Sequence, residues 1–205
     1  MNKIQIKTAT QIGTLFVLPV LLILFGVIPV QYRFFVLLAI TILVIAVIVI
    51  EKWSLKNLGI RLDNIKKSAL WYLIFTVFAT VAIIVLARLL NHNTQNIFGN
   101  IHFQYGFIIL SFLQEFLFRS FLIPKLKVLT ASPTLVIIIS GVLFGLIHII
   151  FANPLSLFVL SSLLGVGFAY VYYFRPNLIL ATVAHSIINF VAVFYCFASF
   201  GANCT

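Results

Sequence analysis

Apolar residues along this chain occur in long continuous runs, without the alternation that marks membrane β-strands. A helix rises about 1.5 Å per residue, so a membrane-crossing helix needs roughly 20 mostly apolar residues. Seven runs in the 205 residues meet this requirement, near 12–30, 34–50, 68–90, 104–123, 134–151, 155–174 and 177–200. The pattern predicts an all-α fold, a polytopic membrane helix bundle that forms a single integral membrane domain over residues 1–205.

The composition excludes a protein that is dissolved in water. Hydrophobic residues make up 63% of the chain, charged residues only 8%, and the mean hydropathy is +1.24. A soluble domain of this size carries about a quarter charged residues. A cytosolic enzyme and a disordered tail are therefore excluded, and two cysteines do not make the framework of a secreted disulfide scaffold. We expect a multi-pass protein of the plasma membrane, and the abundance of Ile, Phe, Asn and Lys favours a low-GC bacterium.

Basic residues are distributed unevenly between the two sides of the predicted bundle. A net charge of +10 would indicate a nucleic-acid partner for a soluble protein, but in membrane proteins lysine and arginine gather on the cytoplasmic side. With the N-terminus inside, the inside segments carry most of the 13 basic residues, namely Lys3, Lys7, Lys52, Lys56, Arg61, Lys66, Lys67, Lys125, Lys127 and Arg175. The outside segments keep Arg33 and Arg88. We expect the N-terminus inside, the C-terminus outside, and membrane lipid rather than nucleic acid as the partner.

The inside loop over residues 51–67 has an amphipathic pattern of its own. Leu55, Leu58, Leu62 and Ile65 follow one another at helical spacing between basic residues. This pattern is typical of a short helix that lies on the anionic cytoplasmic leaflet. A solvated basic loop is the alternative.

A few polar residues interrupt the apolar runs. A charged group at the centre of a membrane helix costs on the order of 2.5–3.5 kcal/mol, so such residues by default face the bundle interior and carry function. They lie in the fourth, fifth and seventh runs: Gln114, Glu115, Arg119, His148, His185 and Asn189. A spacing of four residues places Glu115 and Arg119 on one helix face, and His185 and Asn189 on another.

These groups together suit the hydrolysis of an amide bond. A carboxylate and a histidine can deprotonate a water molecule that attacks a carbonyl carbon. A second histidine and an asparagine can donate hydrogen bonds to the oxyanion that forms. Such a hydrolase needs no covalent intermediate, and a hydrophobic peptide could reach it laterally through the membrane.

Three motifs carry a resemblance to a known family. They occur in the order Gln114-Glu-Phe-Leu-Phe-Arg119, Phe144-Gly-Leu-Ile-His148 and His185-Ser-Ile-Ile-Asn189. They resemble the Glu-Glu-x-x-x-Arg, Phe-x-x-x-His and His-x-x-x-Asn motifs of the CAAX protease and bacteriocin-processing (Abi-type) family. The resemblance covers the core over residues 104–200, and the stretch 53–59 looks like the loop that precedes the family's core.

The resemblance implies a helical intramembrane endopeptidase that cleaves a hydrophobic or prenylated peptide. It implies that His148 activates the water and that His185 and Asn189 form the oxyanion hole, while Glu115 and Arg119 orient the site. No cofactor is expected. Bacterial members of the family are tied to bacteriocin maturation or self-immunity, so a small secreted peptide is an expected substrate.

The chain departs from the family pattern at Gln114, where the family has its catalytic glutamate. A neutral amide can position water but cannot act as a base near neutral pH. Three alternatives follow: Glu115 takes over this role after a local rotation of the helix, His148 acts alone, or this chain does not cleave peptides and serves as a membrane binding protein, such as an immunity factor or a scaffold.

Other interpretations of the same residues stay open. Glu115 and Arg119 could form a structural ion pair, and Asn189 could bridge helices. Glu115, His148 and His185 make a conceivable metal-ligand set, although the chain lacks a His-Glu-x-x-His motif. A proton-coupled carrier could use the same carboxylate and imidazoles as a relay. The many phenylalanines are interpreted as lipid-facing packing.

Overall fold

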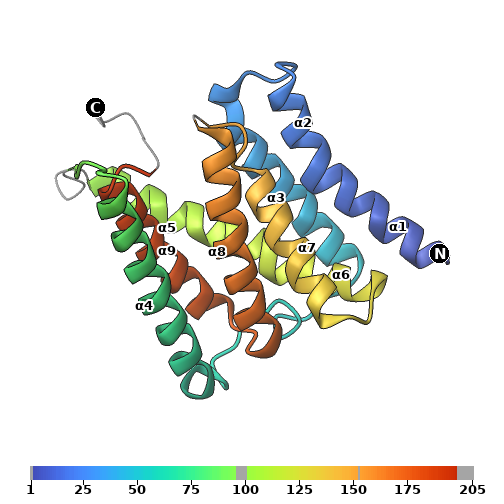
Figure 1. Ribbon diagram of the computed structural model, residues 1–205. Coiled ribbons are helices and arrows are strands. Elements are labelled where there is room, and N and C mark those ends of the chain that lie inside the picture. Colours follow the sequence, from blue (N-terminus) through green and yellow to red (C-terminus); the bar gives the residue numbers. More distant parts are fainter. Residues whose placement is uncertain (1, 96–100, 152, 198–205) are drawn as a thin grey trace.

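The computed structural model describes residues 2–95, 101–151 and 153–197, and the regular secondary structure in these ranges is entirely helical (Figure 1). The elements follow one another as α1 (Lys3–Ile12), the π-helical η1 (Gly13–Val17), α2 (Leu18–Leu24), the short 3₁₀ segment η2 (Val30–Tyr32), α3 (Arg33–Ile50), α4 (Ile65–Leu89), α5 (Ile101–Glu115), the π-helical η3 (Phe116–Leu122), α6 (Ile123–Leu129), α7 (Pro133–Leu146), α8 (Pro154–Phe174) and α9 (Leu178–Phe194).

The predicted polytopic helical bundle is confirmed. Within the described residues, five helical stretches are long and apolar enough to cross a membrane: Lys3–Leu24, Val30–Ile50, Ile65–Leu89, Tyr105–Leu129 and Pro154–Phe174. The helices α7 and α9 are apolar but shorter. Each of the seven predicted runs corresponds to one of these helices, although residues 198–200 of the last run lie outside the described residues.

The first span begins nine residues earlier than the predicted position 12. Asn2 caps α1: its side-chain oxygen accepts a hydrogen bond from the backbone N–H of Gln5 at 2.9 Å. The Gln5 side chain in turn accepts one from the Asn2 backbone at 3.0 Å, which completes a capping box. This cap allows the helix to begin within the polar residues that precede the apolar run. The hydropathy pattern alone does not predict this earlier start.

The fifth run was predicted to stay helical to residue 151, but α7 ends at Leu146. The His148 side chain is the physical reason. Its Nδ1 lies 2.9 Å from the carbonyl oxygen of Phe144, the acceptor that the next helical N–H would use. The backbone N–H of His148 donates to Gly145 instead, at 2.9 Å, and residues 147–150 form turns. His148 therefore lies beyond the helix end rather than within a continuous span.

Three helix–helix contacts position the interior of the bundle. The helix α7 packs along α8, and α9 packs against both α4 and α5 (Figure 1). Glycines allow the close approach of α7 and α8: a Cβ atom on Gly141 would lie 2.6 Å from the backbone nitrogen of Val166. A Cβ atom on Gly165 would lie 2.9 Å from the Gly141 carbonyl oxygen.

The loop before α4 is not the predicted surface helix. Residues 51–64 form turns, and most of their side chains are exposed, as the alternative of a solvated basic loop predicts, but the loop is anchored in the bundle at Leu58 and Gly59. The Leu58 carbonyl oxygen accepts hydrogen bonds from the Ser120 hydroxyl at 2.6 Å and from the Tyr172 hydroxyl at 3.0 Å. Gly59 has a φ of +69°, and a Cβ atom there would lie 2.2 Å from the Tyr172 hydroxyl. The glycine thus breaks the helical pattern and lets the loop enter the core.

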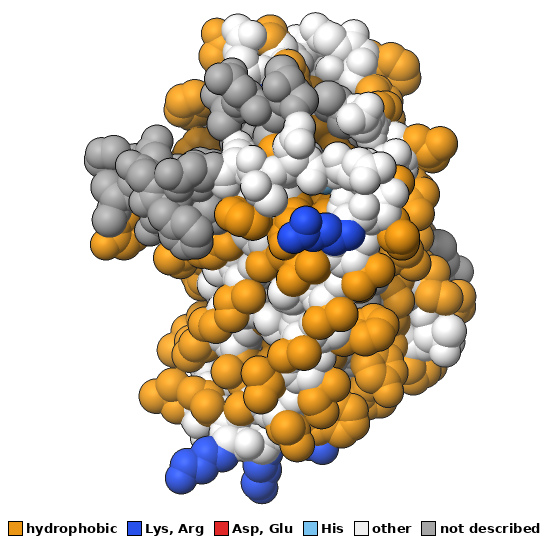
Figure 2. Space-filling view, turned by 60° about the vertical axis from the view of Figure 1, so that its left-hand side comes forward, with side chains coloured by type: hydrophobic (Ala, Val, Ile, Leu, Met, Phe, Trp, Pro, Cys, Tyr) orange, Lys and Arg blue, Asp and Glu red, His pale blue; other side chains and the backbone are white. Residues whose placement is uncertain are grey.

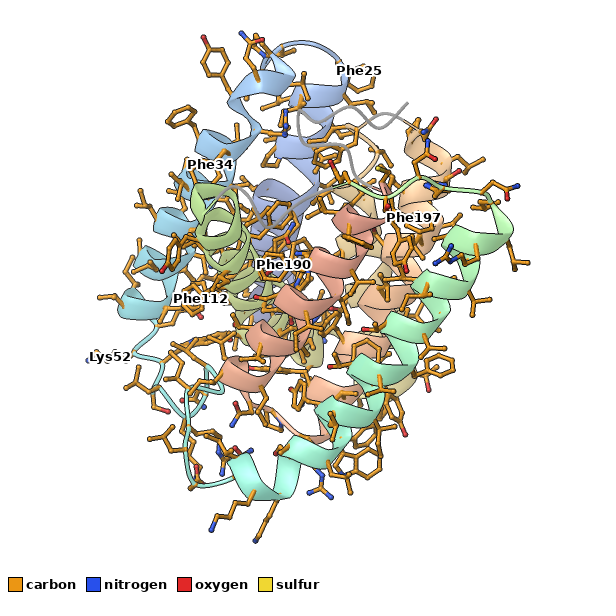
Figure 3. All side chains as sticks on the ribbon, turned by 90° about the vertical axis from the view of Figure 1, so that its left-hand side faces the viewer. Phe25, Phe34, Lys52, Phe112, Phe190 and Phe197 are labelled. Atoms are coloured by element: carbon orange, nitrogen blue, oxygen red, sulfur yellow. The ribbon has the colours of Figure 1, made fainter. Side chains whose placement is uncertain are left out.

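The surface differs between the middle and one end of the molecule. Hydrophobic side chains cover the middle of the face in Figure 2, and basic side chains gather at its lower edge. Figure 3 shows Lys52 projecting outward just after α3, above the lower end where α4 begins. The side that this basic end faces in the membrane stays a prediction from charge.

Candidate active site

A fully buried carboxylate joins three helical segments in the interior of the bundle. Glu115 is the last residue of α5, and its Oε1 lies 2.9 Å from Nδ1 of His185 in α9. Its Oε2 lies 3.2 Å from Nε of Arg119, one turn along the chain. Because a carboxylate accepts hydrogen bonds, His185 donates from Nδ1. The predicted pairing of Glu115 with Arg119 is present, and the contact with His185 adds a link from a distant helix.

The Arg119 guanidinium is enclosed by protein but incompletely hydrogen bonded. One terminal nitrogen donates to Ser140 Oγ of α7 at 2.9 Å. The rings of Phe144 and Phe168 lie 5.2 Å and 5.6 Å from the guanidinium carbon, so both can make cation–π contacts. Within the described part of the chain, Arg119 Nε and Nη2 and Glu115 Oε2 make no hydrogen bond. Such groups in a buried cluster are uncommon and mark a place where chemistry or bound water is expected.

The segment between Glu115 and Arg119 departs from α-helical geometry. The π-helical η3 begins directly after Glu115, and all of its residues are buried. Local π-helical turns inside α-helices occur frequently at functional sites. The sequence pattern predicted a regular helix here, because π-helical and α-helical turns bury nearly the same apolar positions. The π segment contains the arginine that pairs with Glu115.

The two predicted histidines share one aromatic neighbour. The Phe144 ring lies 5.1 Å from the His148 imidazole and 5.6 Å from the His185 imidazole, measured between ring centroids. The hydrogen-bond acceptors fix the tautomer of His148: its Nδ1 faces the Phe144 carbonyl oxygen, so Nδ1 carries the proton and Nε2 keeps a lone pair. His148 Nε2 can therefore accept a proton.

Asn189 lies one turn beyond His185 and faces α5 as well. Its Nδ2 donates to Ser111 Oγ at 3.0 Å, and Ser111 Oγ donates to the Phe107 carbonyl oxygen at 2.8 Å. Successive turns of α9 thus pair with successive turns of α5, His185 with Glu115 and Asn189 with Ser111. One N–H of the Asn189 amide is occupied by Ser111, and the second is available to another acceptor.

Gln114 points to a different place from Glu115. It lines a mostly apolar cavity of about 560 Å³ between η1–α2, α3, α5–η3 and the turn after α7. Ile147 and Ile150, which flank His148 in that turn, also line the cavity. Volumes of this size are typical of sites for small molecules or chain segments. The neutral amide therefore opens onto an apolar chamber, whereas Glu115, its neighbour in the chain, is sealed in the helix interface.

Arg33 is a charged residue that lines this cavity, and it lies at the start of α3. Its guanidinium carbon is 5.2 Å from the Phe151 ring centroid, and Phe151 also lines the cavity. Figure 3 shows the neighbouring Phe34 on the upper part of α3.

The structure brings the predicted polar residues into one region, but in two groups. Glu115, Arg119 and His185 form one contact network, with Asn189 one turn away. Gln114 faces the cavity, and His148 contacts the network through the Phe144 ring. Within the described residues, no three His, Cys, Asp or Glu side chains group closely enough to hold a metal ion.

Several residues of the site were not found from the sequence. Ser140 binds Arg119, but serine is too common in membrane helices to stand out in the sequence. The interpretation of the phenylalanines as lipid-facing is wrong for a buried set around the site: Phe118, Phe144 and Phe168. Hydropathy alone does not separate a lipid-facing ring from one that packs on a guanidinium.

Comparison with known proteins gives one match. The sequence model of a family described as Rce1-like, type II CAAX prenyl endopeptidase, matches residues 71–191. No curated protein and no solved structure matches the chain. The matched range contains all six residues of the predicted site.

Proposed function

Because the chain belongs to the family of Rce1-like type II CAAX prenyl endopeptidases, we propose that it hydrolyses a hydrophobic or prenylated peptide within the membrane by direct attack of water. The observation that carries this proposal is the environment of the Glu115 carboxylate. It is fully buried, and it contacts Arg119 one turn away and His185 from the distant helix α9. A charge buried at this depth is expected to have a functional role.

The cavity beside Gln114 supports a hydrophobic substrate. Its walls are mostly apolar on η1–α2, α3 and α5, so a lipid chain or an apolar peptide segment can displace water from it. The Gln114 amide on its wall can hydrogen bond to a peptide group or to the attacking water. The scissile bond would then lie between the cavity and the Phe144 ring.

His148 is proposed as the general base. Its Nε2 keeps a lone pair because Nδ1 is held by the Phe144 carbonyl oxygen. As the water oxygen bonds to the carbonyl carbon, the water proton moves to His148 Nε2. When the carbon–nitrogen bond breaks, His148 returns this proton to the leaving amine. No covalent enzyme intermediate forms.

His185 and Asn189 are proposed to stabilise the oxyanion. Glu115 accepts from His185 Nδ1 and holds the ring in place, and a ring that carries a proton on both nitrogens can donate from Nε2 to the oxyanion. The Asn189 N–H that Ser111 leaves available supplies a second donor. Glu115 and Arg119 act as positioning residues, because their contacts are with His185, with each other and with Ser140.

A cleavage assay tests the proposal. The full-length protein in neutral detergent is incubated with a farnesylated peptide that carries a fluorophore and a quencher on opposite sides of the scissile bond. We expect Gln114→Glu to raise or create cleavage, because it adds a carboxylate at the cavity wall. Loss of an acid–base group lowers rates by about 10²–10⁴-fold. Glu115→Ala, His148→Ala and His185→Ala should each abolish the signal.

His92→Ala is the matched control for the histidine variants. The His92 ring lies near the Tyr195 carbonyl oxygen, in the segment after α4 and away from the site. The His92→Ala substitution also removes one imidazole group, but it should leave cleavage unchanged. The proposal is wrong if the site variants fold, as judged by circular dichroism, and cleave the peptide like the wild type.

Gln114 favours a second candidate function. If the site lacks a strong enough base because Gln114 is a neutral amide, the cavity binds a hydrophobic peptide without cleaving it. The protein would then act as a self-immunity factor or a scaffold in a bacterial plasma membrane. This function predicts no cleavage by the wild type and tight binding of a fluorescent prenyl peptide. Apolar substitutions that fill the cavity, such as Leu110→Trp, should abolish that binding.

A further inference from the structure

A second, smaller pocket lies at the basic end of the bundle, away from the proposed active site. Its volume is about 270 Å³, and it lies between the start of α4 and the turn that joins α8 to α9. Figure 1 shows these two segments next to each other at the lower end of the molecule. The polar residues that line it are Arg61, Asp63, Asn64, Lys67, Ser68 and Arg175.

Positive charge dominates this pocket. Arg61 forms an ion pair with Asp63, and this pair cancels one positive charge. Lys67 and Arg175 remain as two further cations on its wall. The Arg61 contact holds the pKa of the exposed Asp63 carboxyl below its ordinary value. Asp63 therefore stays ionised and paired, and the pocket keeps an excess of about two positive charges over the lining residues.

The N-terminus of α4 adds to the positive potential. Asn64 occupies the capping position, but its side chain makes no capping hydrogen bond to α4. Instead, its Nδ2 donates to the Pro176 carbonyl oxygen at 3.0 Å, and its Oδ1 accepts from Asn177 at 2.8 Å. The first turn of this 25-residue helix contains lysines and no acidic residue. Helix N-termini attract anions through the helix dipole and unpaired N–H groups.

Ser68 provides an independent indication that this pocket can bind a polar ligand. It lines the pocket and is fully buried. Its Oγ has no hydrogen-bond partner among the residues that the structure describes. Buried hydroxyl groups are nearly always hydrogen bonded, so an acceptor or donor from a bound molecule is expected at this position.

We propose that this pocket binds a phosphate group. The phosphate oxygens would accept hydrogen bonds from Lys67, Arg175 and Ser68, while Arg61 remains paired with Asp63. The residues around it favour a phospholipid headgroup as the source: Leu70 and Trp71 lie exposed on the next turn of α4, and the Arg175 guanidinium lies 5.7 Å from the Trp71 ring centroid. Tryptophan and arginine side by side are typical of the level of lipid headgroups.

Thermal unfolding of the full-length protein in a neutral detergent tests this proposal. Dioctanoyl phosphatidylglycerol, glycerol phosphate and inorganic phosphate are titrated separately, with dioctanoyl glycerol as the uncharged control. Ligands that bind the folded state raise the unfolding temperature. A shift with phosphatidylglycerol alone identifies a lipid headgroup, and a similar shift with all three phosphates identifies a soluble phosphate. No shift with any of them overturns the proposal.

Matched variants locate the effect. Arg175→Gln and Lys67→Gln should each raise the concentration needed for half of the shift about tenfold, since each removes one charged hydrogen bond. Lys52→Gln is the control, because it removes the same charge from the end of α3, apart from the pocket (Figure 3). An equal effect of all three variants would show a general charge effect and overturn the site.

Ser68→Ala separates ligand binding from folding. Because Ser68 Oγ has no partner in the described structure, its removal should leave the unfolding temperature without phosphate unchanged or slightly higher. The same variant should weaken the phosphate response several-fold. If Ser68→Ala responds to phosphate like the wild type, Ser68 does not bind the phosphate. If the phosphate response of Arg175→Gln is also unchanged, the proposal itself is wrong. This outcome is independent of peptide cleavage.

Discussion

Glu51 and Glu115 are both held by basic side chains from distant parts of the chain, but they are satisfied to different degrees. The Glu51 carboxylate, at the end of α3, accepts from four side chains: Lys125 at 2.6 Å, Lys7 at 3.1 Å, Trp53 Nε1 at 3.1 Å and Gln11 at 3.4 Å. Glu115 accepts one hydrogen bond, from His185, and its other oxygen has an ion-pair contact with Arg119 but no hydrogen bond in the described structure.

The two carboxylates also differ in their access to water. Side-chain exposure is 21% for Glu51 and 0% for Glu115. The Glu51 cluster ties α1, α3 and α6 together, because Lys7 and Gln11 of α1 and Lys125 of α6 all donate to the carboxylate that follows α3. Glu115 keeps unused hydrogen-bonding capacity next to the imidazole of His185. A saturated carboxylate is suited to holding helices together, whereas an unsaturated one beside a histidine is suited to chemistry.

The largest expected effect comes from Arg119→Met. This change leaves the Glu115 charge buried without its cation, which costs on the order of 3–5 kcal/mol for a buried pair. The free energy of unfolding in detergent, measured by chemical denaturation, checks it. The double variant with Glu115→Gln should recover part of the loss, because no charge then remains unpaired. If the single variant unfolds like the wild type, the ion pair at Glu115 contributes no more than a surface pair.

A pH titration should affect Glu51 next. Burial by itself raises its pKa, but the hydrogen bonds from Lys125, Lys7 and Gln11 outweigh it and lower the pKa from 4.5 to about 2. A lowered pKa in the folded state stabilises the fold above the unfolded value and loses this contribution as pH falls. We expect a stability difference between wild type and Glu51→Gln above about pH 4.5 that disappears near pH 2. One pKa unit corresponds to about 1.4 kcal/mol, and partial exposure reduces the effect to on the order of 2 kcal/mol.

The wild type and Glu51→Gln form a clean pair for this titration. The chain has only three acidic residues, so few other carboxylates titrate in the same range. Unfolding temperatures of both proteins are followed from pH 7 to pH 2 in the same detergent. If the difference in unfolding temperature between the two proteins grows toward low pH, the pKa of Glu51 is raised rather than lowered. That result would contradict the conclusion that four side chains stabilise the ionised carboxylate.

The sequence predicts the helices and the identity of the polar groups well, because both follow from transfer free energy. A membrane helix needs an apolar run, and a charge such as Glu115 or Arg119 is costly enough to stand out within one. The spacing of four residues also predicts that Glu115 meets Arg119. The family resemblance adds roles for His148 and His185, and these roles stay proposals.

The sequence does not predict features that depend on one hydrogen bond or on the direction of one side chain. The end of α7 depends on whether the Phe144 carbonyl oxygen binds the His148 backbone or its imidazole. The loop near Gly59 enters the core because two hydroxyl groups bind the Leu58 carbonyl oxygen. Likewise, Gln114 and Glu115 are neighbours in the chain, but only the fold shows that one faces a cavity and the other a helix interface.

The smallest expected effects come from taking the Glu51 cluster apart one lysine at a time. The side chain of Lys125 is 5% exposed and packs over Trp53 and Phe121, with ring centroids 5.4 Å away, whereas that of Lys7 is 61% exposed. We expect Lys125→Met to lower the free energy of unfolding by about 1 kcal/mol, and Lys7→Gln by less than about 0.5 kcal/mol, because exposed pairs are screened by water. Neither variant should change peptide cleavage. Equal losses would mean that burial does not set the strength of these pairs, and the contrast between Glu51 and Glu115 would then lose its physical basis.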